Sequence, residues 1–256
     1  MPTDEAATDS TRAEPTSSPR PRAPDPRPPS RDRSRLAMLW YRLVQNVVGL
    51  LWIVTGGLRA SGQRNVPAEG GVLLISNHLS HLDVFVLGLL LPRPLNYVAR
   101  STLFVPGLAF LIRSVGGFAI RREGMGAQGL KETLRRLRNG GIVTLFPEGT
   151  RSRDGELGEL KPGIAVLAAR ARVPIVPTGL AGTFEAWPRS RNWPRPAPIR
   201  VHYGRPILPE AIAGLDPDAL TTLIRDRLLE SRRIARDGLR RDRDAGDSRP
   251  EVGPAA

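Results

Sequence analysis

The sequence contains no cysteine, which limits the chemistry that the chain can perform. Disulfides, thiolate metal sites and cysteine nucleophiles are all excluded. The G-x-S-x-G elbow that presents a serine nucleophile is also absent. Aromatic residues make up only 5% of the chain, too few for a surface that stacks the bases of a single strand. A covalent enzyme intermediate and a single-strand binding surface are therefore both disfavoured.

Lysine is almost as scarce as cysteine, because only Lys131 and Lys161 occur among 38 basic residues. The formal net charge is nevertheless +13, and residues 61–210 carry 20 Lys and Arg against 10 Asp and Glu, a net of +10. The excess charge thus belongs to the middle of the chain. It predicts an anionic partner, such as a phosphorylated ligand, an acidic membrane surface or a nucleic acid.

The N-terminal part of the chain has two contrasting segments. Residues 1–35 are rich in Pro, Arg and Ser, which predicts a disordered tail, and they lack the apolar region of an export signal. Residues 36–60 are predominantly apolar, but their longest uncharged run, residues 43–58, has 16 residues. A free-standing span needs about 20. We expect a helix that lies in or dips into the membrane, with a full crossing and a soluble core helix as alternatives.

From residue 70 onward, short β-rich runs alternate with helical ones. This alternation predicts an α/β core over residues 61–212, with a mixed, largely parallel sheet flanked by helices. An amphipathic helix is expected over 213–243, its arginines forming a solvated face, and a disordered tail over 244–256. The expected strands are 71–76, 95–99, 116–120, 141–146, 173–179 and 199–204, and the expected helices of the core are 81–91, 105–113, 126–139 and 162–171.

The stretch "NHLSHLD", residues 77–83, holds two of the three histidines of the chain. His78 and Asp83 are five residues apart, or about 140° on an ideal helix, so both cannot point one way if both are helical. "SHLD" matches a capping box with Ser80 as N-cap. His78 is therefore expected in the turn before a helix, with Asp83 in the first helical turn, close enough for the two side chains to meet.

Three interpretations of this stretch remain open from the residues alone. Asp83 could simply cap its helix. His78, His81 and Asp83 could ligate a metal, although His202 is far along the chain and the spacing differs from the H-E-x-x-H pattern. A neutral imidazole oriented by a carboxylate could also take a proton from a hydroxyl at neutral pH. Without an enzyme nucleophile of the usual types, that hydroxyl would belong to the substrate.

A second polar loop, "LFPEGTRSRDGELGELKPG", spans residues 145–163 and follows an expected strand. It places Glu148, Gly149, Thr150 and Arg151 at the strand's carboxyl end, where α/β sheets tend to bind ligands. Arginine offers a fork for phosphate, glycine lets the backbone approach closely, and threonine adds a hydroxyl. The alternative is a charged surface turn.

The two loops together resemble a known pattern. "NHLSHLD", "GGFAIRR", "FPEGTRSR" and "VPIVPTGL" occur in the order and at roughly the spacings of the four motifs of the glycerolipid acyltransferases, the lysophosphatidic acid acyltransferase family. The resemblance spans about residues 71–180. It implies that His78 is the general base, which deprotonates the acceptor hydroxyl as that oxygen attacks the thioester of an acyl donor, and that Asp83 orients it.

The resemblance also implies roles for residues outside the first motif. Arg122, Glu148, Gly149 and Arg151 would bind the glycerophosphate part of the acceptor, with Thr150 beside them. Lys161 and Pro177 would serve the donor side or packing. No metal and no cofactor are implied, because acyl-CoA or acyl carrier protein enters as a co-substrate. His81 is not required by the motif and is given no catalytic role.

The expected function is transfer of a fatty acyl chain to 1-acylglycerol-3-phosphate, which gives phosphatidic acid for phospholipid biosynthesis. Another lyso-lipid or glycerol-3-phosphate is the alternative acceptor, and a basic membrane-binding module without activity is the alternative of another class. The expected partners are the acyl donor, the lysophospholipid and a membrane surface, with no nucleic acid. Cytosolic donors and the lack of an export signal predict a membrane-associated protein at the cytoplasmic face of the plasma membrane.

Overall fold

The structure is a computed structural model, and the residues it describes are 34, 36, 38–43, 45–47, 57–100, 116–120 and 126–247. Most of the expected N-terminal tail, the helix expected at 105–113, and Arg122 lie outside the described residues. The same holds for residues 248–256 and for the middle of the apolar run at 43–58.

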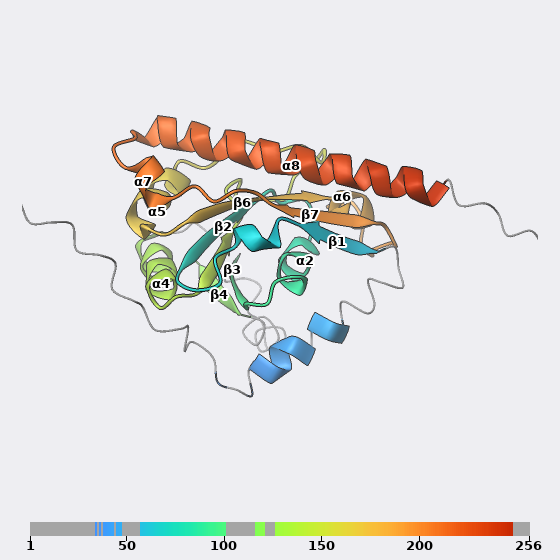
Figure 1. Cartoon of the computed structure of the whole chain (residues 1–256), viewed down its shortest axis with the longest axis horizontal. Helices are drawn as coiled ribbons and strands as arrows, with labels where there is room; N and C mark the ends of the chain where they lie inside the picture. Colours follow the sequence, from blue (N-terminus) through green and yellow to red (C-terminus); the bar gives the residue numbers. More distant parts are fainter. Residues whose placement is uncertain are drawn as a thin grey trace, which may run out of the picture.

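A seven-stranded sheet forms the centre of the molecule, with the order β1-β7-β6-β2-β5-β3-β4 (Figure 1). All neighbouring strands pair in parallel except β6 and β7, which are antiparallel. This confirms the predicted mixed, largely parallel sheet. The strands are β1 Leu58–Ser61, β2 Val72–Ser76, β3 Leu95–Arg100, β4 Gly117–Ile120, β5 Ile142–Leu145, β6 Ile175–Ala181 and β7 Ile199–Tyr203.

All six predicted strands occur, each within two residues of its expected bounds, whereas β1 was not predicted. Its residues were assigned to the apolar helix over 36–60, and that assignment is wrong at its end, because Leu58 pairs with Ile199 of β7. The reason is tertiary. Leu58 and Ala60 pack against one core cluster, while Arg59 is exposed and forms an ion pair with Asp242 of the last helix.

Helices cover both faces of the sheet. α4 (Gly126–Arg138), α5 (Gly163–Ala171) and α8 (Pro217–Asp247) pack on one face, and α2 (Asp83–Leu89) and α6 (Thr183–Ala186) on the other. Side chains of β2 alternate between the two clusters, so both faces of this strand are apolar and its sequence is an unbroken apolar run. The short elements η1 (Gln63–Asn65) and α7 (Pro209–Ile212) complete the fold.

The long helix α8 lies across β6 and β7 (Figure 1). It was predicted over 213–243, but it begins at Pro217 and continues to Asp247, so residues 244–247 are helical and not part of a disordered tail. An ion pair between Asp242 and Arg200 of β7, with 2.6 Å between Oδ2 and Nε, holds its second half to the sheet. The helix approaches so closely at Gly179 that a Cβ there would lie 2.2 Å from the Ser231 carbonyl oxygen.

The N-terminal segment is helical at residues 36, 38–43 and 45–47. Tyr41 is buried, and its hydroxyl accepts a hydrogen bond from the Leu95 N–H at 3.3 Å. The Gln45 side chain donates to the Gly88 carbonyl at 2.5 Å, at the end of α2. This segment is thus attached to the core at α2 and β3. No helix in the described part of the chain combines the length and apolarity that a membrane crossing requires.

Candidate active site

Three central strands bring the predicted motifs to one edge of the sheet. β5, β2 and β6 are parallel neighbours, so their carboxyl ends lie side by side. His78 follows the end of β2, Glu148 follows the end of β5, and α6 follows the end of β6. This is the edge at which α/β sheets place their ligand sites.

His78 and Asp83 form a direct pair at this edge. His78 Nδ1 lies 2.8 Å from Asp83 Oδ2, and Asp83 is fully buried whereas the His78 side chain is 20% exposed. Oδ2 also accepts the backbone N–H groups of Leu79 at 2.6 Å and Ser80 at 2.8 Å. As expected, His78 precedes the helix and Asp83 is its first residue. The carboxylate is therefore fixed by backbone bonds and available to hold one tautomer of the ring.

The predicted capping box is only half formed. Asp83 reaches back to the Ser80 N–H, but the Ser80 hydroxyl accepts the N–H of Leu82 at 3.2 Å instead of that of Asp83. The same hydroxyl donates to the Trp187 carbonyl at 2.9 Å. Ser80 thus connects the turn to the segment after α6, whereas Asp83 holds the turn before α2 and orients His78.

The imidazole and backbone of His78 are held from several sides. The ring stacks on Phe146, with 4.0 Å between centroids and 15° between planes. The His78 carbonyl accepts the Ser152 N–H at 2.7 Å. Next to it, the Asn77 amide both accepts the Leu180 N–H at 2.8 Å and donates to the Leu180 carbonyl at 3.1 Å, which joins the turn to β6. Sequence reasoning gave no role to Asn77, Phe146 or Ser152, although all three lie inside the motifs.

Glu148 connects the two polar loops. It is 4% exposed, its Oε1 accepts the His78 N–H at 2.8 Å, and its Oε2 accepts the Gly158 N–H at 2.9 Å. Burial raises the pKa of this carboxyl, against the opposing effect of the two backbone hydrogen bonds. Both oxygens are thus already engaged with backbone. This favours a positioning role for Glu148 over the direct phosphate contact that we expected from the resemblance.

The residues after Glu148 face solvent beside the histidine turn. Gly149 has a φ of 69°, in the left-handed region that favours glycine, and both Gly149 and Thr150 are exposed. Arg151 is half-buried and close enough to His81 to act on it. The pKa of His81 is lowered first by burial and then by the positive charge of Arg151. The structure therefore brings Arg151 to the same edge as His78, as the resemblance implied.

Comparisons with known proteins agree with this geometry. A family model described as Acyltransferase matches residues 57–181, the region that holds β1 to β6 and both polar loops. The chain is 28% identical over 144 residues to the 1-acyl-sn-glycerol-3-phosphate acyltransferase of Bacillus subtilis, covering 56% of this chain and 71% of that protein. It is 34% identical over 179 residues to the protein of the same name from Limnanthes douglasii, covering 68% of this chain and 62% of that one.

Over residues 57–181 the chain is similar to the acyltransferases that this family model describes. Among solved structures, the 1-acyl-sn-glycerophosphate acyltransferase PlsC of Thermotoga maritima matches with a TM-score of 0.65. The match covers 82% of this chain and 83% of that chain at 22% identity, so it establishes a shared fold.

The remaining predicted site residues, Pro177 and Lys161, occupy different surroundings. Pro177 is buried in β6, where its carbonyl accepts the Gly204 N–H at 2.8 Å and the Ser231 hydroxyl at 3.1 Å. Pro177 was expected either to serve the donor side or to pack in the core, and these contacts favour packing. Lys161 is exposed, and its N–H donates to the Pro147 carbonyl at 2.9 Å, which closes the loop between β5 and α5.

Arginines of α8 also reach the loop between β5 and α5, in contrast to the solvated face that we predicted for them. Arg232 is 5% exposed, donates to the Gly155 carbonyl at 2.6 Å and forms an ion pair with Glu156 at 2.8 Å. Arg236 binds the same carboxylate at 2.6 Å. Because Gly158, two residues later, donates to Glu148, α8 helps to fix the loop that supports His78.

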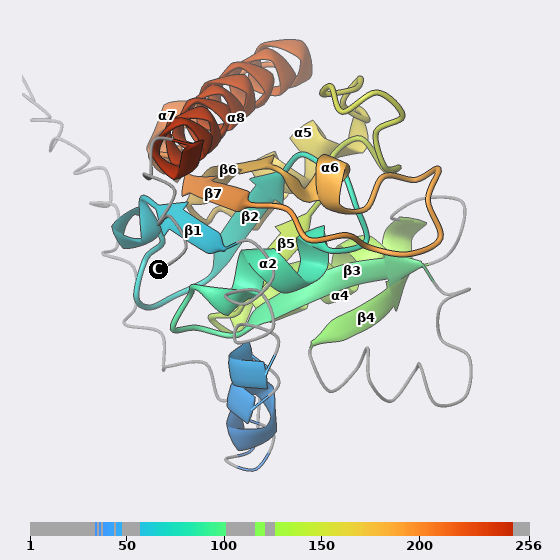
Figure 2. The ribbon, with the colours of Figure 1, turned by 90° about the vertical axis from the view of Figure 1, so that its right-hand side faces the viewer.

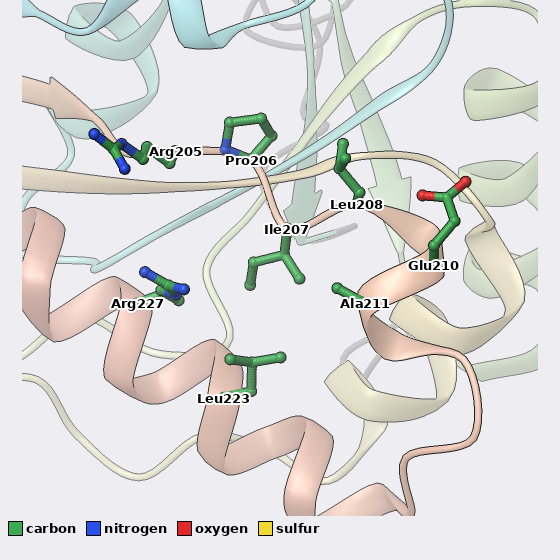
Figure 3. A pocket seen from close by; sticks show the side chains of 8 residues that line it. All are labelled: Arg205, Pro206, Ile207, Leu208, Glu210, Ala211, Leu223 and Arg227. Carbon is green, nitrogen blue, oxygen red and sulfur yellow. The ribbon is translucent and has the colours of Figure 1, made fainter.

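A hollow of about 400 Å³ lies away from these residues (Figure 3). It is lined by the segment after β7, by α7 and by α8, with Arg205 and Arg227 on one side of the apolar residues and Glu210 on the other. Ile207 in its wall pairs with Ile175, the first residue of β6, so the hollow sits at the opposite edge of the sheet from His78. No cluster of three or more metal-binding side chains occurs within the described ranges.

Proposed function

We propose that this acyltransferase transfers a fatty acyl chain from a thioester donor, acyl-CoA or acyl carrier protein, to the free hydroxyl of 1-acylglycerol-3-phosphate. The product is phosphatidic acid. The observation that carries the proposal is the buried Asp83 bound to His78 Nδ1 at 2.8 Å, beside the loop of Arg151. The names of the relatives from Bacillus subtilis and Limnanthes douglasii support the choice of acceptor.

The reaction follows from the orientation of the imidazole. With Nδ1 bound to Asp83, Nε2 is the nitrogen that accepts the proton of the acceptor hydroxyl. The hydroxyl oxygen attacks the carbonyl carbon of the thioester, a new C–O bond forms, and the C–S bond breaks as the tetrahedral intermediate collapses. The thiolate leaves, and His78 then transfers the proton that it took from the hydroxyl to the thiolate sulfur. Since a thiol has a reference pKa near 8.5, activation of the attacking oxygen matters more than assistance to the leaving group.

The acceptor phosphate would be bound by the loop after β5. Gly149 and Thr150 are exposed there, and Arg151 supplies a guanidinium suited to a bidentate phosphate contact. Arg122 is proposed as a second cation, since it follows β4, whose carboxyl end lies at the same edge. The net charge of +10 over residues 61–210 suits both an acceptor phosphate and the phosphates of coenzyme A.

The N-terminal segment supports a membrane location. Five apolar side chains, each at least 41% exposed, lie on one side of the helix: Leu36, Leu39, Trp40, Leu43 and Val47. Their spacings place them within about 100° of arc, while Tyr41 and Gln45, which bind the core, lie on the opposite side. We infer that this stripe rests in the membrane, at the cytoplasmic face where acyl donors are available. Figure 2 shows the segment projecting away from the sheet.

The test is release of free thiol by the purified full chain with acyl-CoA or acyl carrier protein and 1-acylglycerol-3-phosphate in detergent. His78→Ala should lower turnover by about 10²- to 10⁴-fold, the usual contribution of a general base. His81→Ala serves as the matched control and should retain activity. Unchanged turnover in the His78 variant would refute the role of His78 as the general base. Competition with glycerol-3-phosphate and with a phosphate-free lyso-lipid would identify the acceptor.

A further inference from the structure

The loop between α6 and β7, residues 187–198, exposes a tryptophan among arginines; we call it the Trp193 loop. The Trp193 side chain is 80% exposed, and every residue from 189 to 196 is exposed. The loop contains Arg189, Arg191 and Arg195, and no acidic residue occurs from 186 to 209. Figure 2 shows the loop extending outward from α6 before it returns to β7.

The loop is held in shape at its base. The Trp187 indole N–H donates to the Arg191 carbonyl at 2.9 Å, and the Arg195 N–H donates to the Ala186 carbonyl at 2.9 Å. The Arg195 side chain donates through Nε to the Glu185 carbonyl at 2.7 Å. Four prolines within the loop further restrict its backbone. The exposed position of Trp193 is thus set by a preformed loop, which lowers the entropy lost on binding.

The base of the loop also contacts the histidine turn. The Trp187 carbonyl accepts the Ser80 hydroxyl at 2.9 Å, and the Trp187 and His81 rings have centroids 5.4 Å apart. Because the loop follows α6, at the carboxyl end of β6, it lies on the rim of the candidate active site. A surface that docks through this loop would be next to His78.

The chemistry of the loop matches one kind of surface. Within the part of the chain that the structure describes, no ion pair involves Arg189, Arg191 or Arg195. An amphipathic indole favours the headgroup level of a bilayer, and guanidinium groups favour anionic headgroups. Trp193, the most exposed large apolar side chain of the described residues, carries arginines before and after it in the sequence. An acidic carrier protein would satisfy the arginines but gives no reason for an exposed indole between them.

We propose that the Trp193 loop is a second membrane contact, which docks the rim of the active site onto an anionic lipid bilayer. It is separate from the apolar stripe on residues 36–47, and it goes beyond the proposed activity. Trp193 would enter the headgroup region, and the arginines would bind lipid phosphates on either side. The acceptor could then reach the histidine from the bilayer without crossing water.

The first test measures binding of the full chain to sedimented vesicles. Trp193→Ala should weaken binding to phosphatidylglycerol-rich vesicles about tenfold, the contribution of a partly buried large side chain. Arg189→Gln with Arg191→Gln should weaken it by roughly fivefold per arginine, only on anionic vesicles and less at high salt. Leu208→Ala is the matched apolar control, because Leu208 is 50% exposed at the opposite edge of the sheet. Equal losses in the control and loop variants would refute the proposal.

The second test measures the surroundings of the loop directly. Its result therefore does not depend on whether residues 36–47 also bind the membrane. The chain has no cysteine, and Asn192→Cys therefore accepts a single nitroxide label next to Trp193. On anionic vesicles, the label should become more accessible to oxygen and less accessible to a water-soluble relaxation agent. Ala213→Cys, exposed near the opposite edge, should not change.

Two outcomes of the labelling experiment would also overturn the proposal. One is an Asn192 label that stays accessible to water while the protein is bound to vesicles. The other is a label that is shielded by acyl carrier protein and not by vesicles, which would make the loop a carrier-protein site. Neither readout needs acyl transfer, so failure of the proposed activity would remain distinguishable from failure of this contact.

Discussion

Replacing Glu148 with Gln tests whether this residue positions the histidine turn or binds the acceptor. The side chain keeps its size but loses its charge. In the wild-type protein the two carboxylate oxygens accept backbone N–H groups at 2.8 and 2.9 Å, and in the variant the NH₂ group of the amide faces one of these donors. Either the N–H of His78 or that of Gly158 then lacks an acceptor. The position of the imidazole depends on the first of these bonds.

The magnitude follows from two opposing effects. A buried N–H left without a partner costs about 1–3 kcal/mol. Removal of the buried negative charge offsets part of this, because burial already raises the pKa of Glu148. We therefore expect the free energy of unfolding to fall by about 1–2 kcal/mol, which for a domain of this size lowers Tm by roughly 2–8 °C. Displacement of the imidazole by even 1 Å can lower turnover by about 10²-fold.

Thermal unfolding and steady-state kinetics together measure these effects. We expect kcat to fall at least tenfold while KM for 1-acylglycerol-3-phosphate changes less than twofold. Glu159→Gln is the matched control, because Glu159 is exposed in the same loop, and it should leave both constants and Tm unchanged. A Glu148→Gln variant with raised acceptor KM, unchanged kcat and unchanged Tm would refute the positioning role and restore direct contact with the acceptor.

Three further variants probe other contacts. Asp83→Asn should lower kcat by about 10⁴-fold with the fold retained by circular dichroism, because an amide favours the wrong imidazole tautomer; full activity would contradict the base-and-acid pair. Gly179→Ala should prevent soluble expression or lower the free energy of unfolding by several kcal/mol, since a Cβ would lie 2.2 Å from a backbone oxygen of α8; wild-type stability in urea would contradict that packing. Glu156 binds Arg232 and Arg236, whose hydrogen bonds lower its pKa from 4.5 to about 2, so its contribution is complete above pH 4.5 and is lost as the pH falls through 2. Glu156→Gln should therefore flatten the acid side of the stability profile, and an unchanged profile would show that the ion pairs contribute nothing.

The sequence predicts the central sheet well because its strands are short apolar runs separated by turns. The strand β1 is different, since Leu58–Ser61 continues an apolar stretch and becomes a strand only by pairing with β7, far along the chain. The contacts of α8 with the sheet and the loop were missed for a related reason. Its charged residues look solvated in the sequence, but Asp242 and Arg232 bind partners on β7 and on the loop after β5.

The same distinction applies to the site. His78 and Asp83 could be paired from local spacing, because both belong to one turn. The bond from the His78 N–H to Glu148 depends on how the ends of β2 and β5 are aligned, which no local pattern encodes. The motif therefore identified Glu148, but its contacts required the structure. The ring of Phe146 under the imidazole was missed for the same reason.

The position of α8 in the chain has a consequence for biosynthesis. Its arginines hold Gly155 and Glu156 in the loop that supports the histidine turn, yet a ribosome makes α8 after every strand of the sheet. A nascent chain can bring His78 to Asp83, which lie in one local turn, before Arg232 has been synthesised. Until then, Gly155 and Glu156 lack their contacts with Arg232. Full competence thus arrives late in translation, and chains that stop before Arg232 should be poorly active.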